Sequence, residues 1–244
     1  MIGTWGLAIG NWVLGKKATN QLMMGTELNT ASFKLPMPSQ EMRWLEFSTL
    51  LNIQKPIAGV DEVGRGALFG PVVAAAVVLP DFALPDLVAA NIKDSKKLSA
   101  NQRRSLAQQI CELAVDWKIG FASTAEIDRM NILQATLLAM KRAVLKLKTQ
   151  PALCLIDGNQ LVKDLPLPQQ TIVKGDERSL AIASASIIAK VWRDSLVSRL
   201  ASKYPMYDLE RNKGYGSQKH LMALREYGPS LLHRKSFRPC QNNS

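Results

Sequence analysis

Three short strand-like runs that each end on acidic residues are the feature that most restricts how this chain can fold. The runs and the acids that close them are Ile57–Val60 with Asp61 and Glu62, Leu153–Ile156 with Asp157, and Thr171–Lys174 with Asp176. Such short runs bounded by turn residues are typical of strands. In open α/β sheets ligands collect at the carboxyl ends of the strands. We therefore expect these carboxylates to meet at one edge of a sheet.

Carboxylates brought that close repel one another unless a cation lies between them. Asp and Glu oxygens suit Mg²⁺ or Mn²⁺ rather than zinc. Taken singly, Asp157 and Asp176 are more simply explained as turn residues, because Asp is a common turn former. The pair Asp61-Glu62 is no solvated charge run, because it lies between an apolar run and a glycine-rich loop.

The rest of the chain alternates between strand and helix patterns. Strands are predicted at Val72–Leu79 and Trp117–Ser123, and helices from Ser99 with Gln102 to about Ala114, from Asn131 to about Leu147, from Ile182 to about Ser202 and from Ser217 to Tyr227, with Thr124 as the cap of a short turn. This order predicts an α/β domain with a mixed β-sheet flanked by helices. We predict an N-terminal extension over 1–50 and a catalytic domain over 51–244, with a C-terminal helical segment at about 204–244.

The loop from Gly64 to Gly70 matches no standard phosphate-binding motif. It lacks the Gly-Lys-Ser/Thr end of a Walker loop, and its G-x-G-x-x-x-G spacing is only a weak match to a dinucleotide fingerprint. Two carboxylates just before it would also repel a pyrophosphate. Its glycines can instead let the backbone approach a sugar, while Arg65 pairs with a phosphate. A tight turn is the simpler alternative.

The charge of the chain favours a polyanionic partner. The formal net charge is +11, and residues 178–244 carry 12 basic and 4 acidic side chains. A solvated basic face explains this charge equally well. No apolar run reaches the roughly 18 residues needed to cross a bilayer, so no membrane is expected. The three cysteines, Cys111, Cys154 and Cys240, are too few for a disulfide framework, and a reducing, cytoplasmic setting is expected.

Eight segments, in one order, resemble the motifs of bacterial ribonuclease HII. They are Ile57–Gly66, Gly70–Val77, Asp94–Ser99, Leu155–Asn159, Val173–Asp176, Ala183–Asp194, Lys213–Gly216 and His233–Phe237. The resemblance covers about 57–239. Arg65 and the short N-terminus favour this family over the related ribonuclease HIII. Ala67 departs from the family, which often has proline there, and we expect this change to loosen the loop without removing the chemistry.

The resemblance implies a ribonuclease H-like fold and an endonuclease that cuts RNA in RNA–DNA hybrids and single ribonucleotides in duplex DNA. It implies a monomer that binds Mn²⁺ or Mg²⁺, one ion without substrate and a second with it. The implied site residues are the metal-binding, catalytic acids Asp61, Glu62, Asp157 and Asp176, the 2′-hydroxyl sensor Gly64-Arg65-Gly66, the sugar-stacking Tyr215, and the phosphate-binding Lys96 and Lys97. A two-ion mechanism needs no histidine and leaves 5′-phosphate and 3′-hydroxyl ends.

Two other functions remain open from the residues alone. The basic C-terminal quarter is compatible with a non-catalytic nucleic-acid-binding module in which the acids are structural. The glycine loop is compatible with a dinucleotide-dependent enzyme in which Asp81 binds the ribose. Structural roles are expected for Asp194, paired with Lys190, and for the two histidines, His220 and His233.

Overall fold

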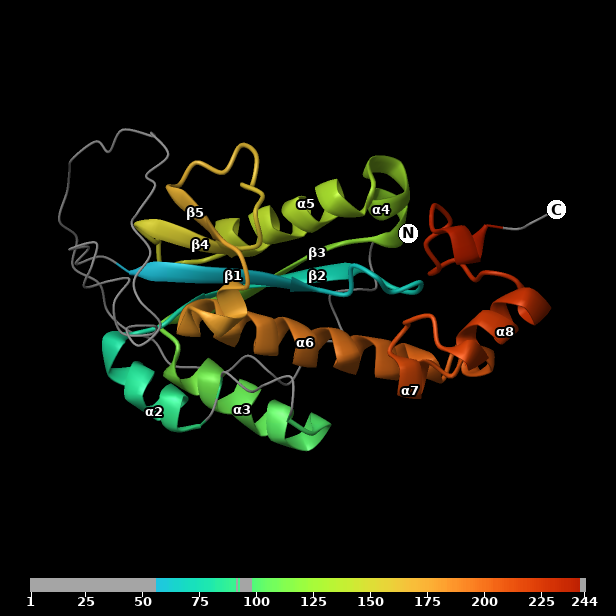
Figure 1. The fold of residues 1–244 in the computed structure, drawn as a ribbon, viewed down its shortest axis with the longest axis horizontal. Coiled ribbons are helices and arrows are strands. Elements are labelled where there is room, and N and C mark those ends of the chain that lie inside the picture. Colours follow the sequence, from blue (N-terminus) through green and yellow to red (C-terminus); the bar gives the residue numbers. More distant parts are fainter. Residues whose placement is uncertain (1–55, 91, 93–97, 242–244) are drawn as a thin grey trace. The chain divides into compact units, whose positions relative to one another are not determined.

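The computed structural model describes residues 56–90, 92 and 98–241. The predicted extension over 1–50 lies outside these residues, as do Lys96 and Lys97. The core of the structure is a five-stranded sheet with the strand order β3-β2-β1-β4-β5 (Figure 1). The strands are β1 (Ile57–Val63), β2 (Val72–Val78), β3 (Asp116–Ala122), β4 (Leu153–Asp157) and β5 (Gln169–Ile172).

The sheet is mixed, as the order of elements predicted. β2 pairs antiparallel with β1 and with β3, whereas β1–β4 and β4–β5 are parallel pairs. β1 is longer than the predicted run, because Asp61 and Glu62 still pair with Ala75 and Ala74 of β2. Pairing of β1 with β4 has already ended at Val60. The two acids therefore lie where β1 extends beyond its parallel neighbour.

Helices cover both faces of the sheet (Figure 1). The main helices are α2 (Leu84–Ala89), α3 (Ala100–Leu113), α4 (Thr124–Met130), α5 (Ile132–Leu145), α6 (Leu180–Ala201), α7 (Leu209–Asn212) and α8 (Gln218–Tyr227). α5 packs on one face of the sheet, against Ala58 and Val60 of β1 and against the buried residues of β2 on that same face. α6, α3 and α2 cover the other face, where Ala75 and Val77 are buried. No helix within the described ranges is long and apolar enough to cross a membrane.

Side-chain caps fix where several helices begin. The predicted capping box of Ser99 and Gln102 is present at the start of α3, and Asn131, where a helix was predicted to begin, is the N-cap of α5. The prediction for Thr124 was wrong by one residue, since Ser123 caps α4 in a box with Glu126. α2 and α7 are too short to have shown a clear helical period in the sequence.

The third predicted strand lies two residues earlier than expected. β5 spans Gln169–Ile172, and the chain then turns at Lys174, whose φ is 55°. A single 3₁₀ turn follows over Gly175–Glu177. Asp176 therefore lies in this turn and not at the last position of a strand.

The C-terminal part is helical, as predicted, and it is built around the loop that joins β1 to β2. Leu68 and Phe69 of that loop are buried in a cluster with the end of α6 and with α7 and α8. Their partners in this cluster include Val197, Leu209 and Leu224. The glycine-rich loop is thus part of the core between the sheet and the C-terminal helices.

Helix α6 approaches the sheet closely because Gly59 has no side chain. A Cβ atom at Gly59 would lie 2.1 Å from the carbonyl carbon of Ala181 and 2.3 Å from the amide nitrogen of Ile182. Gly120 of β3 has the same role opposite α5, where a Cβ would lie 2.1 Å from the carbonyl oxygen of Ala139. Two glycines therefore set how near the covering helices come to the sheet.

We expect Gly59→Ala to destabilise the protein. The added methyl overlaps the backbone of α6, which cannot rotate away as a side chain can, so the free energy of unfolding should fall by about 1–3 kcal/mol. Urea unfolding followed by circular dichroism measures this. Gly66→Ala is the matched control, because a Cβ there meets nothing within 4 Å, and its effect should stay within about 0.5 kcal/mol. Equal effects of the two substitutions would contradict this account of α6.

Candidate functional site

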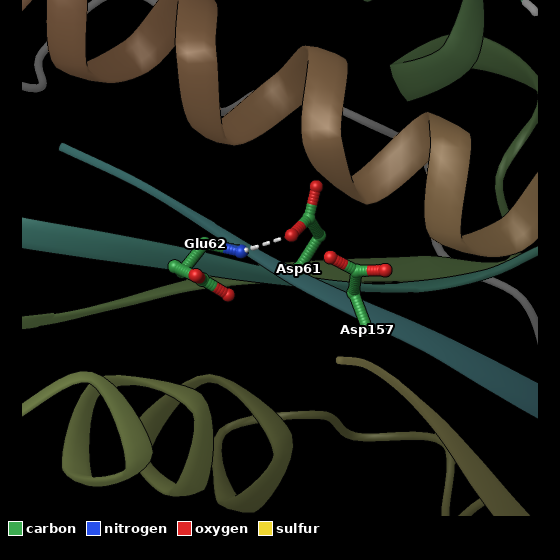
Figure 2. A group of neighbouring side chains, drawn as sticks. All are labelled: Asp61, Glu62 and Asp157. Atoms are coloured by element: carbon green, nitrogen blue, oxygen red, sulfur yellow. Dashed lines mark hydrogen bonds between the residues drawn. The ribbon is translucent and has the colours of Figure 1, made fainter. Parts of the chain in front are cut away.

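Three carboxylates meet where β1 runs past the end of β4 (Figure 2). Asp61, Glu62 and Asp157 each offer an oxygen, and these oxygens lie within 4.8 Å of one another. Asp61 and Glu62 are consecutive strand residues and point to opposite faces, while Asp157 ends the neighbouring parallel strand. The structure therefore brings together three of the four acids that were predicted to share a cation.

Asp61 is the most buried of the three, with 5% of its surface exposed. One of its oxygens accepts a hydrogen bond from the amide of Glu62 at 2.7 Å, and the hydroxyl of Ser186 on α6 also donates to it. Burial raises the pKa of Asp61 well above its usual value, and the charges of Glu62 and Asp157 raise it further. The hydrogen bonds from Ser186 and Glu62 lower this pKa by less, so the protein does not fully compensate the negative charge of Asp61.

Glu62 and Asp157 also contact neighbouring groups. Arg65 lies 3.4 Å from Glu62, but its own side chain is 51% exposed. Burial raises the pKa of Glu62, Arg65 opposes that shift, and Asp157 adds to it. An oxygen of Asp157 accepts a hydrogen bond from the amide of Gly175 at 2.6 Å. Each carboxylate is thus oriented by at least one contact with the protein.

This donor set fits a hard divalent cation. All three ligands are carboxylate oxygens, which Mg²⁺ and Mn²⁺ prefer. Their charges are buried close together, and the pKa values of Asp61 and Glu62 are raised as a result. A bound cation would remove the repulsion that raises these values. The fourth predicted ligand, Asp176, is outside the three-carboxylate group but directly follows Gly175, which binds Asp157.

Two buried arginines hold the glycine-rich loop in place. Arg193 of α6 donates to the carbonyl oxygens of Phe69, Pro71 and Lys213, at 3.0, 3.2 and 2.9 Å. Arg234 donates to the carbonyl oxygens of Gly64, Arg65 and Gly70, at 2.6, 2.7 and 3.0 Å. Both side chains are fully buried. Burial lowers the pKa of Arg234 to about 9, and the nearby Arg193 contributes.

The direction of these hydrogen bonds fixes which side of the loop faces outward. The carbonyl groups of Gly64 and Arg65 point inward to Arg234. In a trans peptide the N–H points away from the C=O, so the amides of Arg65 and Gly66 point outward. Both residues are exposed. The loop therefore presents two backbone donors and one cationic side chain beside the carboxylates.

Gly64 and Gly66 are glycines for different reasons. Gly64 has a φ of 89°, and a Cβ there would lie 2.2 Å from Nε of Arg193. Gly66 has no such φ, and a Cβ there would meet nothing within 4 Å. The fold itself therefore requires glycine at 64 but not at 66. Ala67, the departure noted in the sequence, is buried, and its amide donates to the carbonyl of Gly64 at 3.3 Å, a bond that proline cannot make.

Tyr215 lies beside this loop. The carbonyl of Gly214 accepts hydrogen bonds from the amides of Leu68 and Phe69, at 2.8 and 3.2 Å. The Tyr215 ring has Nζ of Lys190 at 5.5 Å and Cζ of Arg193 at 5.4 Å from its centroid. The structure thus places the predicted stacking residue next to the predicted sugar sensor.

Two further acids considered in the sequence, Asp194 and Asp81, are not part of the three-carboxylate group. Lys190 pairs with Asp194 at 3.0 Å, which confirms the structural pairing expected for Asp194. Asp81 follows β2, whereas the glycine loop precedes this seven-residue strand. Asp81 is therefore at the far end of β2 from the loop, where it cannot serve a dinucleotide bound there.

Sequence reasoning missed Arg193, Arg234 and Ser186 as parts of the site. One signal was available, since Arg193 falls at helical spacing from the apolar residues Ala189 and Val197, on the face that also carries Ile182. A charged residue at such a position is buried only when it is fully hydrogen-bonded. The identity of its partners, which are backbone carbonyls of a distant loop, could not be read from the sequence.

Comparisons with known proteins agree on one family. The family model described as Ribonuclease HII matches residues 58–240. A Ribonuclease HII from Nostoc sp. is 67% identical over 221 residues, which are 90% of this chain and 98% of that relative. One from Acaryochloris marina is 63% identical over 185 residues, or 76% of this chain and 93% of the relative. Among solved structures, the ribonuclease H2 from Pyrococcus horikoshii OT3 has a TM-score of 0.67 and 26% identity, covering 76% of this chain and 95% of its own.

We expect Asp61→Asn to stabilise the metal-free protein at neutral and alkaline pH. The folded state holds the Asp61 proton more tightly than the unfolded state, whose carboxyl pKa is near 3.8. The contribution of Asp61 to stability is therefore greatest below that value and is lost as the pH rises through the raised folded pKa. The loss is about 1.4 kcal/mol for each unit by which the folded pKa exceeds the unfolded one. Asparagine removes this loss. Urea unfolding with a chelator at pH 5 and pH 8 measures it, and the gain should be larger at pH 8.

Asp116→Asn is the matched control for this prediction. Burial works to raise the pKa of Asp116, but Lys118 and the amides of Thr149 and Lys148 bring it below its usual value. Its charge therefore stabilises the fold above the unfolded pKa, and Asp116→Asn should lower stability at pH 8. A metal-free Asp61→Asn protein that is less stable than the wild type at pH 8 would contradict the repulsion described here.

Proposed function

The chain belongs to the ribonuclease HII family and is a type 2 ribonuclease H; we propose that it cuts the RNA strand of RNA–DNA hybrids and incises duplex DNA at single embedded ribonucleotides. The observation that carries this proposal is the buried three-carboxylate group beside a loop whose outward side is backbone amides. A cation site next to donors for a sugar hydroxyl is what selective hydrolysis at a ribonucleotide requires.

Asp61, Glu62 and Asp157 hold the catalytic cation in this proposal, and Asp176 completes the set. The ions are Mg²⁺ or Mn²⁺, one held without substrate and a second added with it, because the scissile phosphate is itself a ligand. When bound, such ions activate water, neutralise charge on the phosphate oxygens and support the leaving 3′-oxygen. Ser186 and the amide of Gly175 direct Asp61 and Asp157 toward the shared position.

The glycine loop reads the ribose. The outward amides of Arg65 and Gly66 donate to the 2′-hydroxyl, which is what distinguishes RNA from DNA at a cut site. The missing side chain at Gly66 leaves room for the sugar to approach. Arg65, which is exposed and lies near Glu62, binds a backbone phosphate. Since the 2′-hydroxyl is used for recognition and not for attack, the products carry 5′-phosphate and 3′-hydroxyl ends.

Tyr215 reads the next sugar along the strand. Its ring packs on a deoxyribose and leaves little room for a 2′-hydroxyl there, so it marks the junction from RNA to DNA. Lys190 and Arg193 close to the ring support its orientation. Lys96 and Lys97 bind backbone phosphates. The protein acts as a monomer in the cytoplasm, and its basic C-terminal quarter attracts the duplex.

Asp157→Asn should abolish cleavage while duplex binding persists. Asparagine keeps an oxygen to accept from Gly175 but removes the charge that holds the cation. We expect the rate to fall by more than about 100-fold. The measurement is cleavage of a duplex with one ribonucleotide, in Mg²⁺ and in Mn²⁺, together with a binding titration. Retained turnover in Asp157→Asn would overturn the metal site, and a wild-type protein that binds the duplex but never cuts it would favour the binding module instead.

Gly66→Ala should fold normally and lose activity. The fold has space for the methyl group, whereas a sugar against the loop does not, and displacing the ribose by about 1 Å costs on the order of 100-fold in kcat/KM. The assay uses the single-ribonucleotide duplex with unfolding by urea as the check on stability. Unchanged kcat/KM in a folded Gly66→Ala protein would show that the ribose does not approach this residue.

Tyr215→Ala should lose most cleavage at a single embedded ribonucleotide and lose less on a long RNA–DNA hybrid. Aromatic stacking on a nucleotide contributes about 1–3 kcal/mol, which corresponds to about 5- to 150-fold in rate. A long hybrid offers other cut sites without a junction. The measurement is kcat/KM on both substrates at one salt concentration. Equal losses would mean that Tyr215 only supports the fold.

A further inference from the structure

The two histidines of the chain are buried against each other. His220 lies on α8, and His233 lies in the segment after that helix; both are almost fully buried. Their Nε2 atoms are 2.9 Å apart. The aromatic rings of Tyr207 and Phe69 pack around them, with centroids 4.6 and 5.1 Å from that of His233. The distance between the two nitrogens is that of a hydrogen bond, so one nitrogen must donate and the other accept.

The backbone at each end of the pair decides which nitrogen carries the proton. Nδ1 of His220 is 2.9 Å from the carbonyl oxygen of Tyr215, which only accepts, so this nitrogen carries hydrogen. Nδ1 of His233 is 2.9 Å from the amide of Ser230, which only donates, so this nitrogen is bare; the hydroxyl of Ser230, also at 2.9 Å, can donate to it as well. If both rings are neutral, Nε2 of His233 must then carry hydrogen and donate to bare Nε2 of His220.

All four hydrogen-bonding positions are satisfied when both rings are neutral. A further proton would place two N–H groups against each other, either between the rings or against the amide of Ser230. Burial lowers the pKa of His233 to about 4, and the neighbouring His220 contributes. Burial also lowers the pKa of His220. The pair is therefore a neutral chain of hydrogen bonds with a fixed direction.

This chain joins the two segments that are proposed to contact the substrate sugars. One end binds the carbonyl of Tyr215. At the other end, His233 forms a β-bridge with Phe69, and the next residue, Arg234, holds the carbonyls of Gly64 and Arg65. The junction-marking ring and the ribose-sensing loop are thus connected through two imidazole rings.

We propose that His220 and His233 act as one positioning unit, which sets Tyr215 relative to the glycine loop and so determines how strongly the enzyme prefers a junction between ribonucleotide and deoxyribonucleotide. This inference rests on the proposed roles of Tyr215 and Gly64-Arg65-Gly66. Neither histidine contacts the carboxylates, and neither is a catalytic residue. Their effect is on which substrate is cut well.

The protonation pattern can be measured directly, because the chain has only two histidines. Tag-free protein labelled with ¹⁵N should show two neutral imidazoles at pH 7, one with hydrogen on Nδ1 and the other with hydrogen on Nε2. Long-range ¹H–¹⁵N correlation spectra distinguish these tautomers. Two rings of the same tautomer, or a charged ring at pH 7, would overturn the proposal whatever the activity of the variants.

Two substitutions of His220 separate positioning from folding. His220→Asn keeps an N–H close to the place of Nδ1, within reach of the Tyr215 carbonyl, whereas His220→Gln places its amide at the position of Nε2. We expect the ratio of kcat/KM on the single-ribonucleotide duplex to that on the long hybrid to fall by about 10-fold in His220→Gln, the size of one lost hydrogen bond. His220→Asn keeps the bond to Tyr215 but breaks the contact with His233, so it too should lower the ratio by several-fold, because either break separates Tyr215 from His233.

Met222→Ala is the matched control on α8, because Met222 is exposed and outside the pair; its ratio should not change. Equal losses on both substrates in His220→Gln, or an unchanged ratio in His220→Asn, would overturn positioning by the pair. Tyr215→Ala in the same assay identifies which proposal fails. An unchanged ratio in Tyr215→Ala would remove the junction role of Tyr215 and this inference with it. A lower ratio there but not in His220→Gln would overturn this inference alone.

Discussion

The direct contact of helix α6 with strand β1 at Gly59 is the constraint on which the site depends. Because no side chain separates them, one stripe of α6 reaches several parts of the site. The stripe follows the helical period: Ile182, Ser186, Lys190, Arg193 and Val197. Going along the helix, it contacts Gly59, the carboxylate of Asp61, the ring of Tyr215 and the glycine loop. A change in the height of α6 above the sheet would move all of these together.

The two ends of this stripe lie beside buried charges of opposite sign. Near Asp61 the protein buries carboxylates without enough compensating charge, and their pKa values rise. This is the condition under which a divalent cation binds strongly, and it costs stability when the cation is absent. Near Arg193 and Arg234 the buried charge is positive, and six backbone carbonyls satisfy it. The first arrangement leaves room for a ligand, and the second makes a loop rigid.

Local patterns in the sequence were sufficient for most of the fold. The mixed sheet, the capping box at Ser99 and the cap at Asn131 follow from residues close together in the chain, and the structure confirms them. Errors arose where a distant partner decides the outcome. β1 extends through Asp61 and Glu62 because β2 continues to pair there, and β5 ends early because the chain turns at Lys174 to bring Gly175 to Asp157.

The sequence by itself determined the chemistry: which acids lie near the carboxyl ends of the strands, that the metal ligands are all oxygen, and which family motifs are present. It could not determine how the acids and the loop are held, because many of those contacts join residues distant in the chain, in some cases more than 100 positions apart, as between Arg234 and Gly64. Only the tertiary structure distinguished Gly64, which the fold requires, from Gly66, which it does not. It also brought the two histidines together. The physical reason is that side-chain type sets what a group can bind, whereas packing decides which groups are near enough to bind it.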